Sequence, residues 1–292
     1  IPRHRVAPMQ PRRVARRILG EPLTRRVRLA TGGTVPEGPS GLRAGARPGG
    51  GSLRRAFDRL PAPLRRADLT DWAWHFGTDK WGSHWYTPHY ERHLGHLRRQ
   101  RFTLLEIGVG GYDWGAGGES LRMWSAFFPR ARIVGLDLVD KTRLSRGRVV
   151  VRRGDQTDPE LLRSLVTEFG PVTVVVDDGS HRPEHVRETF RILFPLLPDG
   201  AFYAIEDTQT SYWPGWGGSL DRSDPTTTMA LVKDLLDGLN HEEYLVADAA
   251  PSATDRTVRA VHCYHNLVVI EKGDNEEGSN RELVPGKEGA PA

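Results

Sequence analysis

The stretch Phe102-Thr-Leu-Leu-Glu-Ile-Gly-Val-Gly-Gly111 is a short apolar run that leads directly into a group of glycines. Such a run is typical of a buried strand, and glycines at its carboxyl end let a ligand approach the backbone closely. The next strand-like stretch, 132–137, ends in Asp137, where a carboxylate can accept both hydroxyls of a ribose. The glycine loop and the acid together predict a nucleotide-like ligand, and their spacing alone is equally compatible with NAD.

Strand-like and helix-like stretches alternate along the chain around this loop. The expected strands lie at 102–107, 132–137, 148–153, 172–177 and 201–205, and the expected helices at 120–128, 158–169, 187–197 and 229–239. Two further strand-like stretches, 258–264 and 267–272, are separated only by His265-Asn266, which predicts a hairpin. This order predicts an α/β fold, a doubly wound sheet with a C-terminal antiparallel hairpin.

The two ends of the chain differ from its middle in composition. Residues 1–66 hold 16 arginines against three acidic residues, a net charge of +13, whereas the remainder carries a net charge of −9. Because 1–66 is rich in Arg, Pro and Gly and has no sustained period, we expect a disordered basic leader; the alternatives are a nucleic-acid-binding arm and a targeting segment. The polar tail 274–292 is also expected to be disordered, which leaves 67–273 as the folded domain.

Composition excludes several classes of protein. With 38% hydrophobic residues the chain can bury a core, and no apolar run approaches the roughly 18 residues of a membrane span. Cys263 is the only cysteine, so no disulfide can form within one chain. The reducing cytoplasm is therefore the expected compartment.

Further polar residues favour S-adenosylmethionine over NAD as the ligand of the glycine loop. Glu106 stands before the glycines, where it can help to hold a cationic amino acid. Asp155 and Gln156 follow the third strand, where a carboxylate can accept a hydrogen bond from an adenine amino group. The alternative is that these residues are ordinary loop acids and turn glycines.

A cluster of acids is predicted at the carboxyl ends of the fourth and fifth strands. The fourth strand runs into Asp177-Asp-Gly-Ser-His181, and the fifth ends in Glu206-Asp207. Because the carboxyl ends of parallel strands line one edge of a sheet, these acids should converge. Three oxygen ligands, Asp178, Glu206 and Asp207, suit Mg²⁺ or Ca²⁺ better than Zn²⁺. The alternative is a set of solvated acids with a helix cap.

His181 lies three residues after Asp178, close enough to reach a group that the metal holds. A neutral imidazole is a suitable general base, a role worth about 10²–10⁴-fold in rate. The aromatic residues Tyr212, Trp213 and Trp216 follow the acids on a glycine-rich loop. They are candidates to pack against a sugar or a larger ring system, and the alternative is that they anchor the loop.

Four long motifs resemble those of the actinomycete macrolide-sugar O-methyltransferases, and the resemblance covers about residues 70–273. The motifs are Phe76-Gly-Thr-Asp-Lys-Trp-Gly-Ser-His-Trp-Tyr-Thr-Pro-His-Tyr-Glu91, Leu105-Glu-Ile-Gly-Val-Gly-Gly-Tyr112, Asp177-Asp-Gly-Ser-His181 and Ile205-Glu-Asp-Thr-Gln-Thr-Ser-Tyr-Trp-Pro214. The resemblance implies a class I methyltransferase (Rossmann-like) fold, S-adenosylmethionine as methyl donor and Mg²⁺ in the active site.

The resemblance also implies roles for individual residues. Asp178, Glu206 and Asp207 would be the metal ligands, and His181 would accept the proton. The residues that would hold S-adenosylmethionine are Glu106, Gly108, Gly110, Ser120, Asp137, Asp155, Gln156 and, closing over it, Tyr86. A homo-oligomer is expected, although residues 1–66 are too rich in Gly, Pro and Arg to form the folded auxiliary domain of longer family members.

The expected reaction is transfer of the sulfonium methyl group to a deoxysugar hydroxyl of a macrolide-type antibiotic. One alternative substrate is a catechol or another vicinal diol, which needs the same metal. Another is a cephalosporin-type compound. The non-enzyme alternative is a nucleic-acid-binding protein that uses the basic leader. The negative charge of residues 67–292 argues against that alternative.

Overall fold

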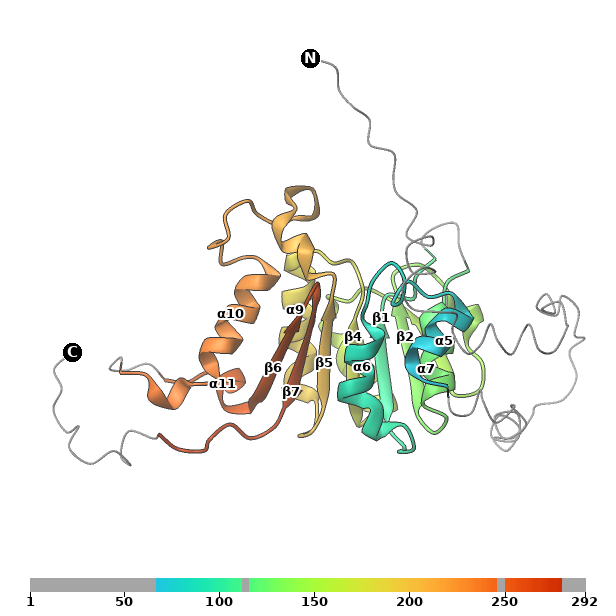
Figure 1. The fold of residues 1–292 in the computed structure, drawn as a ribbon, viewed down its shortest axis with the longest axis horizontal. Helices are drawn as coiled ribbons and strands as arrows, with labels where there is room; N and C mark the ends of the chain where they lie inside the picture. The colour runs from blue at the N-terminus through green and yellow to red at the C-terminus, as the bar shows by residue number, and fades with distance from the viewer. Residues whose placement is uncertain (1–66, 112–115, 246–249, 280–292) are drawn as a thin grey trace, which may run out of the picture. The chain divides into compact units, whose positions relative to one another are not determined.

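The computed structural model describes residues 67–111, 116–245 and 250–279 (Figure 1). These residues form two compact units, one made of 67–101 with 118–130, the other of 102–111, 116–117, 131–245 and 250–279. The predicted leader 1–66 and residues 280–292 of the predicted tail lie outside the described residues. Within the described ranges, none of the helices combines the length and the apolar character needed to cross a bilayer.

The second unit is built on a seven-stranded sheet. Its strands are β1 (Thr103–Ile107), β2 (Arg132–Asp137), β3 (Val149–Arg153), β4 (Val172–Asp177), β5 (Phe202–Glu206), β6 (Val258–Tyr264) and β7 (Leu267–Lys272). The spatial order is β3-β2-β1-β4-β5-β7-β6, with β1 to β5 parallel and β7 antiparallel to both of its neighbours. The predicted sheet and hairpin are confirmed, and each strand agrees with its predicted bounds within one residue.

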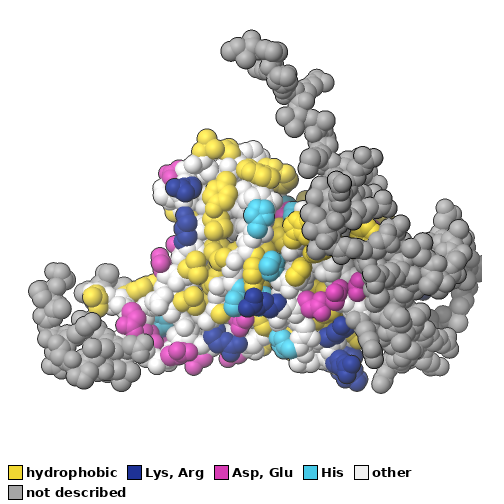
Figure 2. Space-filling view, in the orientation of Figure 1, with side chains coloured by type: hydrophobic (Ala, Val, Ile, Leu, Met, Phe, Trp, Pro, Cys, Tyr) yellow, Lys and Arg dark blue, Asp and Glu magenta, His cyan; other side chains and the backbone are white. Residues whose placement is uncertain are grey.

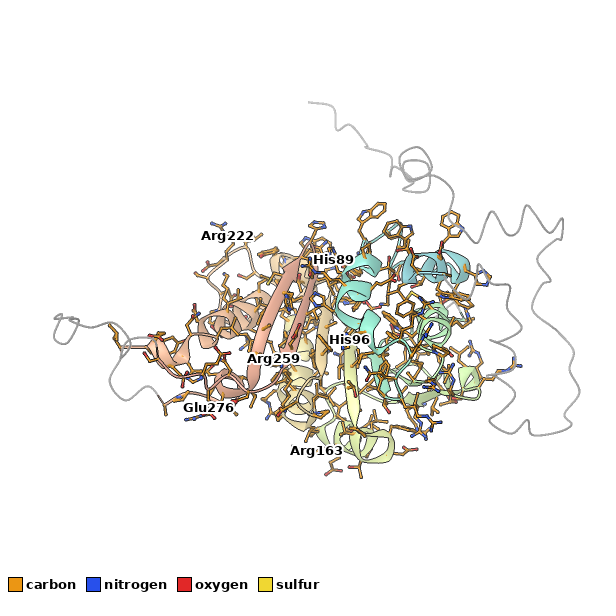
Figure 3. The ribbon with its side chains drawn as sticks, turned by 60° about the horizontal axis from the view of Figure 1, so that its bottom comes forward. His89, His96, Arg163, Arg222, Arg259 and Glu276 are labelled. Atoms are coloured by element: carbon orange, nitrogen blue, oxygen red, sulfur yellow. The ribbon has the colours of Figure 1, made fainter. Side chains whose placement is uncertain are left out.

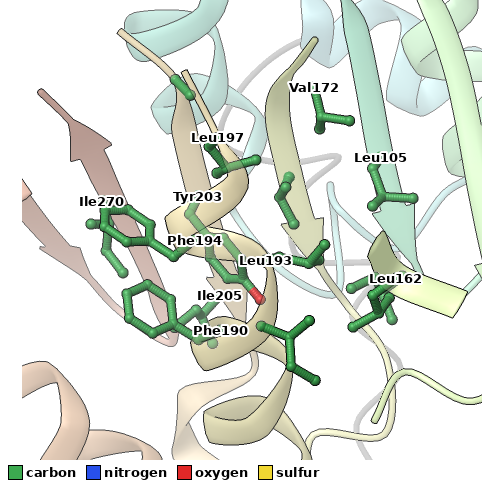
Figure 4. Close-up of a cluster of buried hydrophobic side chains, with 14 of the residues drawn as sticks. Leu105, Leu162, Val172, Phe190, Leu193, Phe194, Leu197, Tyr203, Ile205 and Ile270 are labelled. Atoms are coloured by element: carbon green, nitrogen blue, oxygen red, sulfur yellow. The ribbon is translucent and has the colours of Figure 1, made fainter. Parts of the chain in front are cut away.

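Helices α8 (Pro159–Phe169), α9 (Pro183–Leu193) and α10 (Thr228–Gly238) share one apolar core with the sheet. Phe190 of α9 stacks on Phe194 with 4.7 Å between ring centroids, and it meets Tyr203 of β5 edge-on at 5.1 Å (Figure 4). Leu162 of α8 and Leu105 of β1 belong to the same cluster. This close-packed core fixes the positions of the strands and therefore of the residues at their carboxyl ends.

Helix α9 begins and ends earlier than the predicted helix 187–197. It starts at Pro183, because a proline at the first helical position loses no hydrogen bond that the helix needs. After Leu193 the chain continues as a short 3₁₀ turn, η3 (Phe194–Leu196), and Pro195 in it has no N–H to continue an α-helix. The early start leaves only a short turn between β4 and α9.

The order of the strands reverses between β1 and β4, since the chain runs outward through β2 and β3 and then returns to β4. In open parallel sheets, ligands bind beyond the carboxyl ends of the strands at such a point. Gly108, Asp137, Asp178 and Asp207 all stand at the carboxyl ends of strands in this part of the sheet. The fold therefore positions the predicted acids and glycines along one edge.

The first unit contains α5 (Leu69–Phe76), α6 (Thr87–Leu94), a 3₁₀ turn η1 (Gly95–Leu97) and α7 (Glu119–Phe127). In its interior, the ring of Trp124 meets that of Tyr90 edge-on at 5.1 Å. The sequence predicted α7, at 120–128, but neither α5 nor α6. Asp68 and Asp71 each accept a hydrogen bond from the other's backbone N–H. This capping box at the start of α5 was a recognisable signal.

The residues that follow β7 are held by hydrogen bonds. The remaining short elements of the second unit are α11 (Ala253–Thr257), η2 (Thr142–Leu144), η4 (Thr208–Tyr212), η5 (Pro214–Trp216) and η6 (His241–Glu243). The side-chain amide of Asn275 donates to the carbonyl of Asp255 at 2.8 Å. Glu276, labelled in Figure 3, pairs with Arg256 of α11. Residues 274–279, which the sequence assigned to the disordered tail, are therefore fixed at this end of the unit.

Candidate active site

The turn that follows β4 carries two of the predicted site residues. Asp178 and His181 are half-buried, with 22% and 17% of their side-chain surfaces exposed. The backbone N–H of Asp178 donates to the carbonyl of Ile107, the last residue of β1, at 2.9 Å. This hydrogen bond extends the pairing of β1 with β4 by one residue and fixes Asp178 at the carboxyl edge of the sheet.

His181 and Asp207 both have left-handed backbones, with φ angles of 56° and 54°. Such angles are uncommon outside glycine and cost about 1–3 kcal/mol each, so they persist only where the surrounding structure imposes them. The buried hydroxyl of Thr210 lies 2.7 Å from the carbonyl oxygen of His181 and 2.9 Å from that of Asp207. Thr210 thereby ties the two strained residues together.

The side chains of Asp178, His181 and Asp207 form one cluster. Nε2 of His181 is 3.9 Å from an oxygen of Asp178 and 3.7 Å from an oxygen of Asp207. One ligand atom from each residue lies within 4.8 Å of the others. Two carboxylates this close repel each other, and their hard oxygens suit a small divalent cation. The donor set therefore fits the predicted Mg²⁺.

Glu206, the third predicted metal ligand, is not part of this cluster. It is the last residue of β5 and has 3% of its surface exposed. It points to the sheet face opposite Ile205, because side chains alternate along a strand, whereas Asp207 has already turned out of the strand. The structure thus brings together two of the three predicted metal ligands, and the role of Glu206 stays a prediction.

Asp177, the last residue of β4, lies in a buried polar network next to this cluster. The hydroxyl of Tyr203 and the amide of Gln156 each donate to its carboxylate at 3.3 Å. Burial raises the pKa of Asp177 to about 7, although these two hydrogen bonds and one from the backbone of Gly179 favour the ionised form. Burial and the nearby carboxylate also raise the pKa of Tyr203. Asp177 therefore takes part in hydrogen bonds in the interior of the second unit and is not one of the predicted metal ligands.

Asp137, the predicted ribose acid, ends β2 among several donors. Its two oxygens accept hydrogen bonds from the backbone N–H groups of Val109 at 2.9 Å and Val139 at 2.8 Å. The ammonium group of Lys141 lies 3.1 Å from the oxygen that Val109 contacts, and it also donates to the carbonyl of Gly110. The carboxylate is thus joined directly to the glycine loop.

Lys141 was missed by the sequence reasoning. Only 3% of its side chain is exposed, which is rare for a lysine unless it is paired. It lies four residues after Asp137, but the two are not in a helix. Their contact depends on how the chain turns after β2, so no periodic pattern in the sequence indicated it.

Gly108 and Gly110 both have positive φ angles, 83° and 67°, but different surroundings. A Cβ atom on Gly108 would lie 2.0 Å from the backbone carbonyl oxygen of Asp178. A Cβ atom on Gly110 would meet no atom of the described residues within 4 Å. Gly108 is therefore required by the close approach of the turn after β4, while Gly110 has no such contact with the described residues.

The other predicted cofactor residues of this unit differ in exposure. Glu106 is fully buried on β1. Asp155 is exposed, and its carboxylate accepts hydrogen bonds from the backbone N–H and the hydroxyl of Thr157, both at 2.8 Å, which lower the pKa of Asp155. Gln156 is buried, and its amide is directed toward the turn after β4. Their contacts with a cofactor stay predictions.

Two predicted cofactor residues, Tyr86 and Ser120, lie in the first unit. Tyr86 precedes α6, and its buried ring stacks on that of His84 with 4.7 Å between centroids. Ser120 is the second residue of α7 and is buried. Their predicted roles also remain predictions.

The loop after β5 exposes large aromatic side chains. Tyr212, Trp213 and Trp216 have 42%, 48% and 44% of their surfaces exposed. Apolar side chains are prominent on the part of this loop that rises above α9 (Figure 2). The ring of Trp216 lies 6.2 Å from that of His181. An apolar surface therefore adjoins the cluster of acids.

No protein-family model matches the chain. Among curated proteins, the mycinamicin VI 2″-O-methyltransferase of Micromonospora griseorubida is 44% identical over 228 residues, which cover 76% of this chain and 56% of the relative. The demethylmacrocin O-methyltransferase of Streptomyces fradiae is 47% identical, covering 75% and 57%. An 8-demethyl-8-alpha-L-rhamnosyl tetracenomycin-C 2′-O-methyltransferase of Streptomyces olivaceus is 46% identical, covering 75% and 59%. The chain thus spans little more than half the length of these relatives.

Solved structures agree with this result. The MycE methyltransferase from the mycinamycin biosynthetic pathway, in complex with Mg and SAH, superposes with a TM-score of 0.73 at 42% identity, covering 77% of this chain and 59% of that one. A complex that also contains mycinamycin VI gives 0.70 at 44% identity, covering 74% and 56%. The predicted resemblance is confirmed: over about three quarters of its length the chain is related to the macrolide-sugar O-methyltransferases, and it has their class I methyltransferase fold.

Proposed function

We propose that this chain transfers the methyl group of S-adenosylmethionine to a sugar hydroxyl of a glycosylated natural product, with Mg²⁺ in the active site. The observation that carries the proposal is the cluster of Asp178, His181 and Asp207 at the carboxyl edge of the sheet. The relatives are O-methyltransferases by name, one of them for a rhamnosyl tetracenomycin, and a related structure holds Mg and SAH. A macrolide or similar antibiotic is the proposed acceptor, and a homo-oligomer the proposed assembly.

Asp178 and Asp207 would hold the cation, and Glu206 is a further candidate ligand. When bound there, Mg²⁺ supplies Lewis acidity that makes a neighbouring hydroxyl more acidic. The two carboxylates flank Nε2 of His181 at 3.9 Å and 3.7 Å. A sugar hydroxyl directed to this cluster would therefore lie close to both His181 and the two carboxylates.

His181 would remove the proton of the sugar hydroxyl as the new carbon–oxygen bond forms. In the same step the bond between sulfur and the methyl carbon breaks, and its electron pair neutralises the sulfonium. The proton then resides on the imidazole of His181, from which solvent can remove it. Because Thr210 holds the backbone of His181, the direction of the base is set before the substrate arrives.

Asp137 would accept hydrogen bonds from the ribose hydroxyls of the cofactor. Lys141 and the N–H of Val109 hold that carboxylate against the glycine loop, where Gly110 would lie beside the ligand. The remaining proposed contacts are those predicted from the sequence, from Glu106, Gly108, Ser120, Asp155 and Tyr86. Beside His181, Trp216 would pack against the sugar or the ring that bears it.

The proposal is tested by an acceptor screen with the purified chain, S-adenosylmethionine and MgCl₂. The acceptors are a glycosylated macrolide, its aglycone and a catechol, and the readout is mass spectrometry of each. We expect one added methyl group on the glycoside and none on the aglycone. Methylation of the catechol alone would assign the chain to small vicinal diols instead. An absence of binding to S-adenosylmethionine, with no acceptor methylated, would contradict the proposal.

A further inference from the structure

The side chain of Gln156 makes contacts that the predicted cofactor role does not explain. Gln156 lies in the loop between β3 and α8 and is 8% exposed. Its Oε1 accepts a hydrogen bond from the backbone N–H of Ser180 at 2.8 Å. Its Nε2 donates to the carboxylate of Asp177 at 3.3 Å and to the hydroxyl oxygen of Thr189 in α9 at 3.0 Å. Both amide hydrogens and one lone pair are therefore used inside the protein.

These contacts lie at both ends of the turn after β4. Asp177 directly precedes Asp178, the proposed metal ligand, and Ser180 directly precedes His181, the proposed base. One planar amide thus holds the backbone on each side of the reacting groups. The hydroxyl of Thr189 lies 3.0 Å from the backbone carbonyl oxygen of Gln156 and 2.7 Å from that of His185, so its one proton is shared between the loop and the helix.

The glycine in the middle of the turn supports the same interpretation. A Cβ atom on Gly179 would lie 2.3 Å from Oε1 of Gln156. Gly179 is absent from the glycines with a positive φ, so its backbone conformation is open to other residues. A side chain at this position would therefore displace the Gln156 amide, and it would also crowd Cγ2 of Ile107 at 3.0 Å.

We propose that Gln156 is a positioning residue for the metal and the base: its amide clamps residues 177–180 and thereby sets the directions of Asp178 and His181. The proposal rests on the function proposed above and places Gln156 on the metal side of the site rather than the cofactor side. Residues that orient metal ligands in this way typically contribute about 10–100-fold to metal affinity or activity.

The first test is Gln156→Leu in the full chain, with Mg²⁺ alone and S-adenosylmethionine alone titrated by calorimetry. We expect Mg²⁺ affinity to fall about 10–100-fold, with S-adenosylmethionine affinity within about threefold of the unaltered chain. Turnover should fall with little change in KM for the glycoside. If this variant does not fold, Thr189→Val removes one partner of the amide at nearly constant volume and should shift the same quantities less.

A pair of substitutions tests the clamp more directly. Gln156→Glu places a carboxylate opposite Asp177 and should weaken Mg²⁺ binding. Adding Asp177→Asn restores one amide and one carboxylate with their positions exchanged. The double variant should bind Mg²⁺ and turn over better than either single variant, which is the coupling expected for residues that interact directly.

Two results would overturn this inference alone. One is a tenfold or larger loss of S-adenosylmethionine affinity in Gln156→Leu with unchanged Mg²⁺ affinity, which would return Gln156 to the cofactor site. The other is a folded Gln156→Leu variant with both affinities and turnover unchanged. If the unaltered chain binds neither Mg²⁺ nor S-adenosylmethionine, the proposed function fails and this inference fails with it.

Discussion

The acid at the end of β2 and the acids after β4 and β5 lie on the same edge of the sheet, but their surroundings differ in charge. Asp137 accepts two backbone N–H groups and lies 3.1 Å from the ammonium group of Lys141. Asp178 and Asp207 instead share the imidazole of His181, at 3.9 Å and 3.7 Å. The first carboxylate thus has an ammonium partner, whereas the two acids of the second site lie beside one imidazole.

This difference indicates which site is complete before a ligand binds. The charge of the Asp137 carboxylate is already balanced by Lys141, and its oxygens are oriented by backbone N–H groups. A neutral ribose can therefore bind without adding charge. The second site has two left-handed residues, His181 and Asp207, and two carboxylates close enough for one divalent cation to bind both. We therefore expect changes at the second site to act mainly on catalysis and changes at the first to act mainly on stability and cofactor binding.

Removal of the metal should have the largest effect. Excess EDTA should abolish methyl transfer, and added Mg²⁺ should restore it, because the two carboxylates alone cannot activate a hydroxyl. Asp178→Asn should lower turnover by about 10³-fold or more, with S-adenosylmethionine affinity within a few-fold of the unaltered chain. Product formation measured at several chelator concentrations checks this. Full activity in excess EDTA would refute the metal assignment.

Loss of the base should come next. His181→Ala should lower turnover by about 10²–10⁴-fold, the usual contribution of a positioned general base. Affinities for Mg²⁺ and S-adenosylmethionine should change by no more than a few-fold, because the carboxylates remain. The matched control is His265→Ala, an exposed histidine in the hairpin turn, which should leave turnover unchanged. Near-normal turnover in His181→Ala would make His181 a structural turn residue.

The strands and the strand-end acids could be predicted from the sequence because their signals are local. The β-branched run 172–177 gave its strand with both bounds correct, and the carboxyl-edge rule then placed Asp178 and Asp207 together. The contacts of Lys141 and of Gln156 could not be predicted. They depend on turns that bring separate loops together, and neither residue belongs to a periodic pattern.

The two glycines of the cofactor loop should differ in their effect on stability. Gly108→Ala should lower the free energy of unfolding by about 2–4 kcal/mol, since its Cβ would press on the carbonyl of Asp178 in a left-handed backbone. Gly110→Ala should cost only about 1–2 kcal/mol, because only the backbone term applies. Urea denaturation of both variants measures the difference. Equal losses would mean that the glycine loop can move away from the turn after β4 without a further loss of stability.

The last effect concerns Lys141, and it tests the comparison itself. Lys141→Met keeps most of the buried stem but removes the ammonium group from Asp137, so the free energy of unfolding should fall by about 1–3 kcal/mol. Added Mg²⁺ should not restore this loss, because the metal belongs to the other acids. Asp207→Asn should do the opposite: without metal it relieves repulsion and should leave stability unchanged or slightly higher, while it removes the stabilisation by Mg²⁺. Lys233→Met is the matched control, since Lys233 is exposed and its loss should fall within about 0.5 kcal/mol. Thermal denaturation with and without Mg²⁺ measures all three variants. If Lys141→Met has no effect while Asp207→Asn destabilises the chain without metal, the roles assigned to the two sites must be reversed.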